Sequence, residues 1–308
     1  MSACASELPD ASLPAPSTSA GQSSSGTSGG ATTTDATTTL GAPLAVERRT
    51  LHLVDATRST PAAGSEPRVP QRVLETDLYL PDGDGPFPLI VHVHGFSGSP
   101  GKFTELLTRW SEAGFVVAAP RFPRTSDTGP GTAGIADYVD QPADVSFVID
   151  ELLADTAIAA RVDAQRIGVA GLSLGGGTVY GLVWHECCRD ARIDAAIVMS
   201  SLRFPFGPAD FGVNEIPVMI MHGDQDLALP YADAVASYRS SAPPKWFVHL
   251  IGGTHSEPYE NRVSPHDAIV TDVTTAFWAL TLGGDPSAAA RLRSVGNAAG
   301  LSTVIAAP

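Results

Sequence analysis

Short apolar segments alternate with amphipathic ones from residue 45 to near the end of the chain. From the third onward, the apolar segments are brief and rich in Val and Ile, which is typical of strands buried on both faces. The predicted strands cover residues 46–54, 73–80, 89–94, 116–119, 167–170, 196–199, 218–221 and 247–251.

The segments between these strands have apolar residues at helical spacing, which predicts helices. In 142–160, for example, Val145, Val148, Ile149 and Leu152 recur at helical intervals. The predicted helices cover residues 102–113, 142–160, 174–186, 231–240 and 265–282. Such alternation predicts an α/β fold, with a mostly parallel eight-stranded sheet and helices on both faces. The first two strands are separated only by a turn-rich segment, so we expect them to form an antiparallel hairpin.

Residues 1–44 lack this periodicity. Their central part, 17–40, is almost wholly Ser, Thr, Gly and Ala with one charge, Asp35. Such a segment cannot bury enough apolar surface to offset chain entropy. We therefore expect a disordered tether over 1–44, followed by one folded domain over 45–308.

Composition narrows the class of protein. The 308 residues are 43% hydrophobic and 17% charged, as in ordinary globular proteins, and the net charge is −14. This acidity argues against nucleic acid as a partner, because nucleic-acid affinity rests on Lys and Arg. Three cysteines exclude a disulfide framework. Cys187 and Cys188 could form a vicinal disulfide, but the favoured interpretation is two small helix residues packing as hydrophobes.

Cys4 follows Met-Ser-Ala and precedes the Ser/Thr/Gly tail, which resembles the cleavage region of bacterial lipoproteins. Two interpretations stay open with similar weight. If Cys4 is lipidated, the tether holds an exported domain off a membrane surface, in an extracellular or periplasmic location. Otherwise Cys4 is an unremarkable residue of the tail.

The candidate nucleophile is Ser173, in Gly171-Leu172-Ser173-Leu174-Gly175, which matches G-x-S-x-G. The motif lies between a predicted strand and a predicted helix, where a sharp turn exposes the serine hydroxyl in a strained conformation. Gly176 and Gly177 let the helix pack close to the sheet. The alternative is a glycine-rich turn with an incidental serine.

A serine hydroxyl needs a base, and in this arrangement the acid and then the histidine follow the serine. His52, His92 and His94 precede Ser173; His185, His222 and His249 lie on predicted helix or strands. Of the two that remain, His255 is preferred, because it lies in the loop after the last predicted strand. His266 is expected in the first turn of the final helix, facing away.

The acid comes from His222-Gly223-Asp224-Gln225-Asp226, at the carboxyl end of a predicted strand. Asp226, deeper in the loop, is preferred as the partner of His255. We expect Asp224 to cap backbone amides in the turn.

An oxyanion hole requires two backbone N–H groups. One belongs to Leu174, after the nucleophile, and the other to Phe96 in the glycine-containing loop after the third strand. The Phe96 ring is then expected to line the substrate pocket. The alternative is a loop that merely connects strand to helix.

Four segments, HVHGFSGS, GLSLGGGT, HGDQDLALP and GGTHSEPY, together resemble the α/β-hydrolase superfamily. Within it they are similar to the dienelactone-hydrolase-like, chlorophyllase-like and platelet-activating-factor-acetylhydrolase-like group, near bacterial cutinases and polyester hydrolases. The resemblance covers residues 45–308. It implies the α/β-hydrolase fold, a Ser173–Asp226–His255 triad, an oxyanion hole from the amides of Phe96 and Leu174, and no metal or organic cofactor.

The resemblance also bears on the substrate. True dienelactone hydrolases often use Cys, so Ser173 favours ordinary esters. Cutinases commonly carry His and Met around the serine, and Leu172 and Leu174 stand there instead, which argues against polyesters. The segment 200–215 is too short for a large lid, and its Phe204 and Phe206 are expected to line the pocket. The loop 120–141 is expected to form the opposite rim.

These observations predict a monomeric serine carboxylic-ester hydrolase for small to medium acyl esters, with lipids and polymeric esters as further candidates. An acyltransferase, thioesterase or peptidase on the same triad is the alternative. A more distant one is an inactive, surface-anchored binding protein on a hydrolase scaffold.

Overall fold

The computed structural model describes residues 42–207 and 211–307. Cys4 and nearly all of the predicted tether lie outside these residues. At the start of the described part, the Leu44 amide donates a hydrogen bond of 2.9 Å to the Glu112 carbonyl. Residue 44 is therefore already attached to the folded domain.

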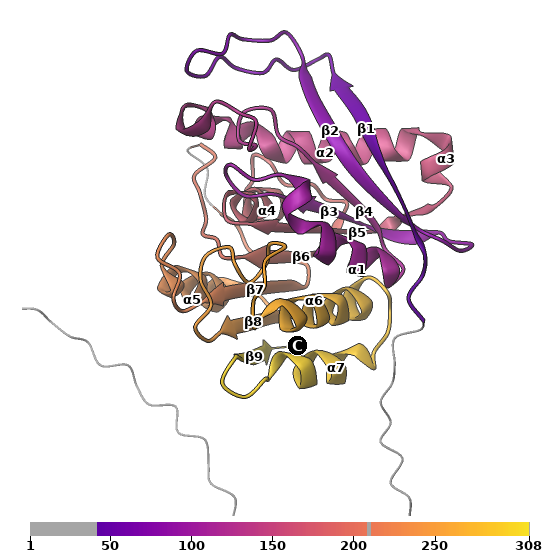
Figure 1. Ribbon diagram of the computed structural model, residues 1–308, viewed down its shortest axis with the longest axis vertical. Helices are drawn as coiled ribbons and strands as arrows, with labels where there is room; N and C mark the ends of the chain where they lie inside the picture. The colour runs from indigo at the N-terminus through magenta and orange to yellow at the C-terminus, as the bar shows by residue number, and fades with distance from the viewer. Residues whose placement is uncertain (1–41, 208–210, 308) are drawn as a thin grey trace, which may run out of the picture. The chain divides into compact units, whose positions relative to one another are not determined.

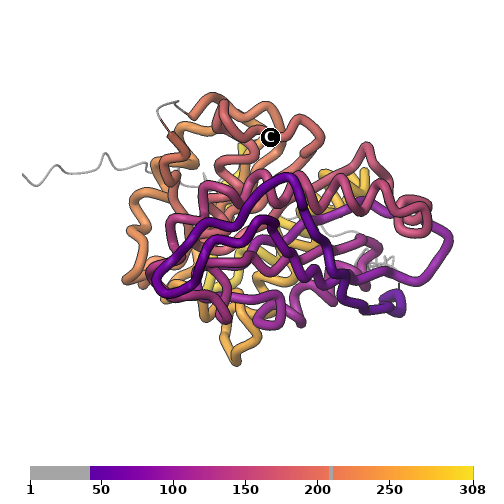
Figure 2. Tube along the Cα trace, turned by 90° about the horizontal axis from the view of Figure 1, so that it is seen from above, coloured from indigo at the N-terminus to yellow at the C-terminus, as the bar shows by residue number. Residues whose placement is uncertain are grey.

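Nine strands form one sheet in the order β1-β2-β4-β3-β5-β6-β7-β8-β9 (Figure 1). The strands are β1 Val46–Asp55, β2 Arg72–Pro81, β3 Phe87–Val93, β4 Val116–Pro120, β5 Val162–Leu172, β6 Ile193–Met199, β7 Val218–Gly223, β8 Lys245–Leu250 and β9 Ser302–Ala307. Strands β3 to β8 are parallel, and β1 pairs with β2 in the expected antiparallel hairpin. Viewed from above, this indigo hairpin lies in front of the yellow C-terminal elements at the other edge of the sheet (Figure 2).

The prediction of eight strands is wrong by one. β9 pairs antiparallel with β8 at the edge of the sheet. Of its six residues only Ser302 is buried; the other five are partly buried or exposed, and Ile305 is among the exposed ones. An edge strand of this kind lacks the continuous apolar run by which the central strands were recognised.

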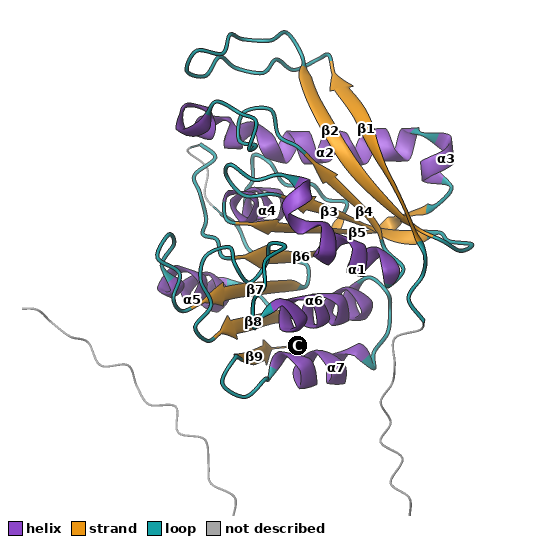
Figure 3. Cartoon of the chain, in the orientation of Figure 1, coloured by secondary structure: helices purple, strands orange, loops and turns teal. Residues whose placement is uncertain are grey.

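Helices cover both faces of the sheet (Figure 3). They are α1 Thr104–Glu112, α2 Gln141–Ala154, α3 Thr156–Ala159, α4 Leu174–Trp184, α5 Tyr231–Ser240, α6 Asp267–Thr281 and α7 Ala288–Gly296, with 3-10 segments η1 Pro100–Phe103 and η2 Gly131–Asp140. Among them, α7, η1 and η2 were not predicted. None of the described helices has the length and apolar character needed to cross a bilayer.

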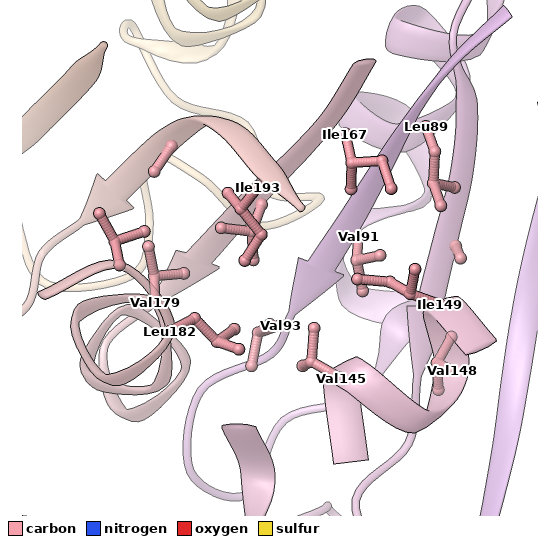
Figure 4. Close-up of a cluster of buried hydrophobic side chains, with 14 of the residues drawn as sticks. Leu89, Val91, Val93, Val145, Val148, Ile149, Ile167, Val179, Leu182 and Ile193 are labelled. Carbon is pink, nitrogen blue, oxygen red and sulfur yellow. The ribbon is translucent and has the colours of Figure 1, made fainter. Parts of the chain in front are cut away.

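Two apolar clusters hold the layers together. On one face, α2 and α4 pack against alternate residues of the central strands, as Val145 and Ile149 do against Val91 (Figure 4). On the other face, α1 and α6 pack against the intervening residues, including Ile90 of β3. This alternation is what a strand buried on both faces requires.

The predicted single helix over 142–160 is interrupted at Asp155. Its backbone is extended, with φ −71° and ψ 111°, and its carboxylate accepts hydrogen bonds from the amides of Ala157 and Ile158. Asp155 thus ends α2 and caps α3, a role that short acidic side chains favour.

Cys187 and Cys188 form a disulfide, so the favoured interpretation of two helix residues is wrong. Helix α4 ends at Trp184, and the cysteines lie in the following turn, where the Cys188 amide donates to the His185 carbonyl. Apolar helical spacing continued past the true end of the helix, which hid this turn.

A buried ion-pair cluster joins the hairpin to α2 and η2. The Arg72 side chain of β2 is fully buried and contacts both carboxylate oxygens of Asp137 and of Asp144, at 2.5–3.0 Å. Burial alone lowers the pKa of Arg72, but hydrogen bonds to the two carboxylates outweigh it and raise the pKa. Arg72 therefore stays charged, and its removal would leave two carboxylates buried.

We expect Arg72→Met to lower the free energy of unfolding by about 3–5 kcal/mol, because breaking a buried pair strands the remaining charge. The control is Arg189→Met, which removes an exposed pair with Glu215 and should cost less than about 1 kcal/mol. Urea denaturation of both variants measures the difference. Equal, small losses would show that the cluster does not stabilise the fold.

Candidate active site

Ser173 lies at the turn between β5 and α4, as the motif predicted. Its backbone has φ 55° and ψ −119°, a region that non-glycine residues rarely occupy. The Ser173 amide donates to the Met199 carbonyl at 2.9 Å, and the Ser201 hydroxyl donates to the Ser173 carbonyl at 2.6 Å. Strand β6 and the segment after it therefore hold the strained turn in place.

Gly175 allows the first turn of α4 to lie against the end of β3. A Cβ atom at this position would be 2.2 Å from the Val93 carbonyl oxygen and 2.7 Å from that of His94. Both neighbours are backbone atoms, so they cannot turn aside as a side chain could. The last glycine of the motif is therefore required for the close approach of α4 to β3.

The structure brings Ser173, His255 and Asp226 into one hydrogen-bonded chain. Nε2 of His255 is 2.8 Å from the Ser173 hydroxyl oxygen, and Nδ1 is 2.7 Å from Oδ2 of Asp226. A carboxylate only accepts, so Nδ1 carries the proton and Nε2 is left to accept one from the hydroxyl. Asp226 is fully buried, whereas the His255 side chain is 26% exposed.

Four contacts surround the Asp226 carboxylate. Oδ1 accepts from the amides of Ala228 and Leu229 at 2.8 and 2.9 Å, and Oδ2 accepts from His255. The fourth contact, Nε2 of His222 at 3.0 Å from Oδ2, was not predicted. Burial by itself raises the pKa of Asp226, but the hydrogen bonds from His255, Leu229 and Ala228 outweigh it and hold the pKa below its usual value. Asp226 is therefore ionised at neutral pH.

Asp224 and His266, the two residues not preferred as acid and base, make other contacts. Asp224 contacts Nε2 of His249 at 3.0 Å and accepts from the Gly252 amide at 2.8 Å, so it does cap a backbone amide. His266 is buried at the start of α6, where its Nε2 is 3.0 Å from the Ile251 carbonyl oxygen. Both residues tie loops to their neighbours, while the hydroxyl of Ser173 contacts His255.

The amides of Phe96 and Leu174 lie at the two loops beside Ser173. The neighbouring amides form hydrogen bonds within the protein: the Ser97 amide donates to the Thr125 carbonyl, and the Ser173 amide donates to the Met199 carbonyl. Within residues 42–207 and 211–307, neither the Phe96 nor the Leu174 amide donates to a backbone carbonyl of a turn or loop. These are the two N–H groups that the sequence predicts for an oxyanion hole.

His94 supports this loop, a role that sequence analysis missed. Its Nε2 accepts from the Phe122 amide at 3.2 Å, so its Nδ1 donates to the Gly95 carbonyl at 2.8 Å. Burial lowers the pKa of His94 to about 4, which keeps the ring neutral. In the sequence, nothing distinguishes such a residue from an ordinary core histidine.

Phe204 and Phe206 pack along α4. Phe204 covers Gly177, one helical turn after Ser173, and Phe206 covers Gly181, a further turn away. Tyr138 of η2 packs against both rings, at centroid distances of 5.9 and 5.3 Å. The loop 120–141 and the segment after β6 are thus in contact here, and the expectation of two opposite rims is wrong at this point. The described parts of that segment, 200–207 and 211–217, contain no helix, as expected without a large lid.

Among the described residues, one cluster has the spacing of metal ligands: His185, Cys187 and Cys188. Both sulfur atoms are joined in the disulfide, so they do not offer thiolates to an ion.

The chain is similar to several known proteins. A family model described as chlorophyllase matches residues 51–201, which include Phe96 and Ser173. The chain is 24% identical over 188 residues to Cutinase 2 of Thermobifida cellulosilytica, covering 59% of this chain and 65% of that protein. It is 26% identical over 129 residues to Lipase 1 of a Moraxella species, covering 41% of this chain and 38% of that protein.

The chain has the α/β-hydrolase fold. The predicted resemblance to the group near cutinases is confirmed, and these relatives support an esterase-type hydrolase in general. The chain is also similar to an uncharacterized protein, YfhR of Salmonella typhimurium, at 24% identity over 220 residues, covering 61% of this chain and 72% of that protein.

We expect Gly175→Ala to slow the reaction of Ser173 with a fluorophosphonate at least tenfold and to destabilise the fold by about 1–3 kcal/mol. The added methyl group must push α4 away from β3, as in overpacked cores. Gly101→Ala is the control, since the nearest atom to its Cβ would be 3.9 Å away. Labelling rates and denaturation midpoints are the readouts. Unchanged labelling in Gly175→Ala would contradict the required close approach.

Proposed function

We propose that this protein is a serine carboxylic-ester hydrolase that works through an acyl-enzyme on Ser173. One observation carries the proposal: His255 bridges the Ser173 hydroxyl and the buried Asp226 carboxylate, at 2.8 and 2.7 Å. The two free amides beside Ser173 support it, because they lie where an acyl-transfer enzyme needs donors.

In the first half-reaction, Nε2 of His255 takes the proton of the Ser173 hydroxyl as the oxygen attacks the ester carbonyl. The amides of Phe96 and Leu174 stabilise the negative oxygen of the tetrahedral intermediate. His255 then gives the proton to the departing alcohol, and the acyl group remains on Ser173. Throughout, Asp226 stabilises the protonated imidazole.

In the second half-reaction, His255 takes a proton from water, and the resulting hydroxide attacks the acyl-enzyme. The same two amides hold the second oxyanion. His255 returns the proton to the Ser173 oxygen as the acid leaves, which restores the starting state. Each step uses residues already in hydrogen-bonding positions.

Small to medium acyl esters are the proposed substrates. The described part of the segment after β6 forms no helical cap, and Phe204 lies one turn from Ser173, where it limits the space beside the nucleophile. Tyr138, which packs against Phe204 and Phe206, would then help to border the acyl pocket.

Ser173→Ala should lower kcat/KM for p-nitrophenyl acetate about 10⁴-fold or more, and Asp226→Asn about 10⁴-fold, because the triad acts as a unit. Asp224→Asn is the matched control, the same change two residues away in the same loop, and should retain activity near that of the wild type. Labelling by a fluorophosphonate, located by mass spectrometry, should be confined to Ser173. Wild-type activity in Ser173→Ala would refute the proposal.

Phe204→Ala should shift the preference toward longer acyl chains, by roughly tenfold in the ratio of kcat/KM values, because removing the ring opens space beside Ser173. A p-nitrophenyl series from acetate to palmitate measures this ratio. Phe206→Ala, one helical turn further away, should shift it less. Identical profiles for the wild type and Phe204→Ala would place the acyl chain elsewhere.

A further inference from the structure

His222 places a second imidazole against the carboxylate of the triad. It lies near the end of β7, four residues before Asp226, and its side chain is fully buried. Nε2 is 3.0 Å from Oδ2 of Asp226 and 3.1 Å from the Leu229 carbonyl oxygen. Since Nδ1 of His255 is 2.7 Å from the same Oδ2, one carboxylate oxygen lies between two imidazole rings.

The surroundings of His222 determine which nitrogen carries its proton. Nε2 faces two oxygens that only accept, so it is the protonated nitrogen. Nδ1 is buried without a hydrogen-bond partner among the described residues. A ring that donates from Nε2 and leaves Nδ1 bare is a neutral imidazole.

Burial favours this neutral form over the attraction of Asp226, and the charged and titratable groups around the ring are few. They are Asp226 in the following loop, His255 from the loop after β8 and Tyr231 of α5, whose ring centroid is 6.1 Å from that of His222. Burial lowers the pKa of His222, despite the nearby Leu229 carbonyl and Asp226 carboxylate. His222 therefore offers Asp226 an N–H dipole and not a second positive charge.

We propose that His222 is a positioning residue of the triad, which holds Oδ2 of Asp226 toward His255 and tempers the charge of the carboxylate. The proposal rests on the proposed function of Ser173, Asp226 and His255. The two backbone amides restrain Oδ1 only, so Oδ2 is free to move out of line with Nδ1 of His255 unless His222 restrains it. The N–H dipole also disperses the negative charge on Oδ2, which weakens the attraction of that oxygen for a positively charged imidazole.

His249 and Asp224 form a similar pair nearby, which makes it possible to distinguish a role of His222 in the triad from support of the loop after β7. His249 of β8 contacts Oδ2 of Asp224 at 3.0 Å, the same kind of contact at the same distance, and its ring also packs against Tyr231. Neither residue of this pair contacts Ser173 or His255 in the described structure. A change at His249 therefore perturbs the loop without touching the triad.

The experiment compares His222→Leu, His222→Gln and His249→Leu in the full-length protein, with kcat and KM for p-nitrophenyl acetate measured from pH 5 to 9. We expect His222→Leu to lower kcat about tenfold with KM unchanged and to move the acid limb of the profile to higher pH by about half a unit. His222→Gln should restore most of the kcat and most of the wild-type position of the acid limb, because the glutamine amide N–H reaches toward Oδ2 of Asp226. His249→Leu should match the wild type.

If His222→Leu fails to fold, His222→Asn replaces it, because the shorter amide does not reach Oδ2. A loss of kcat without a shifted acid limb, or without recovery in His222→Gln, would overturn the proposal, since that is the signature of a merely structural residue. So would wild-type behaviour of His222→Leu. If Ser173→Ala is inactive and only Ser173 is labelled, the proposed function stands and the role of His222 alone is refuted.

Discussion

The parallel run of β3, β5, β7 and β8 brings their carboxyl ends to one edge of the sheet, and the candidate site is built there. Phe96, Ser173, Asp226 and His255 each follow one of these strands within a few residues. Separations of up to 159 positions in the chain, as between Phe96 and His255, thus become contacts or near neighbours around one hydroxyl. Each strand brings its loop to the site, and the loop then sets the orientation of the functional group.

The same edge carries unusual backbone strain. In the described residues, the non-glycine positions with positive φ are Ser97, Ser173 and Ser200, which follow β3, β5 and β6. Such conformations cost about 1–3 kcal/mol each and persist only where surrounding structure holds them. Here their amides donate to Thr125, Met199 and Met221. The rigid sheet thereby supports a geometry that an isolated loop would not keep.

Histidines show where sequence reasoning reached its limit. Chain order and strand position were enough to select His255 from eight candidates, and the structure places it between Ser173 and Asp226. The same reasoning set aside His94 because it precedes Ser173, and His222 because it lies on a predicted strand. Both are buried, yet one holds the Gly95 carbonyl and the other touches the Asp226 carboxylate. Residue type and burial do not reveal these contacts, because they depend on which atoms of distant loops a ring faces.

The sequence by itself determined the alternation of strands and helices, the hairpin, and the choice of Ser173, Asp226 and His255 as candidate residues, because apolar period and turn chemistry act over a few residues. Only the tertiary structure decided the ninth strand, the Cys187–Cys188 disulfide and the contact of Tyr138 with Phe204. It also placed His222 against the triad. Each of these depends on how segments meet at edges, turns and loop surfaces, and no local pattern along the chain encodes those distances.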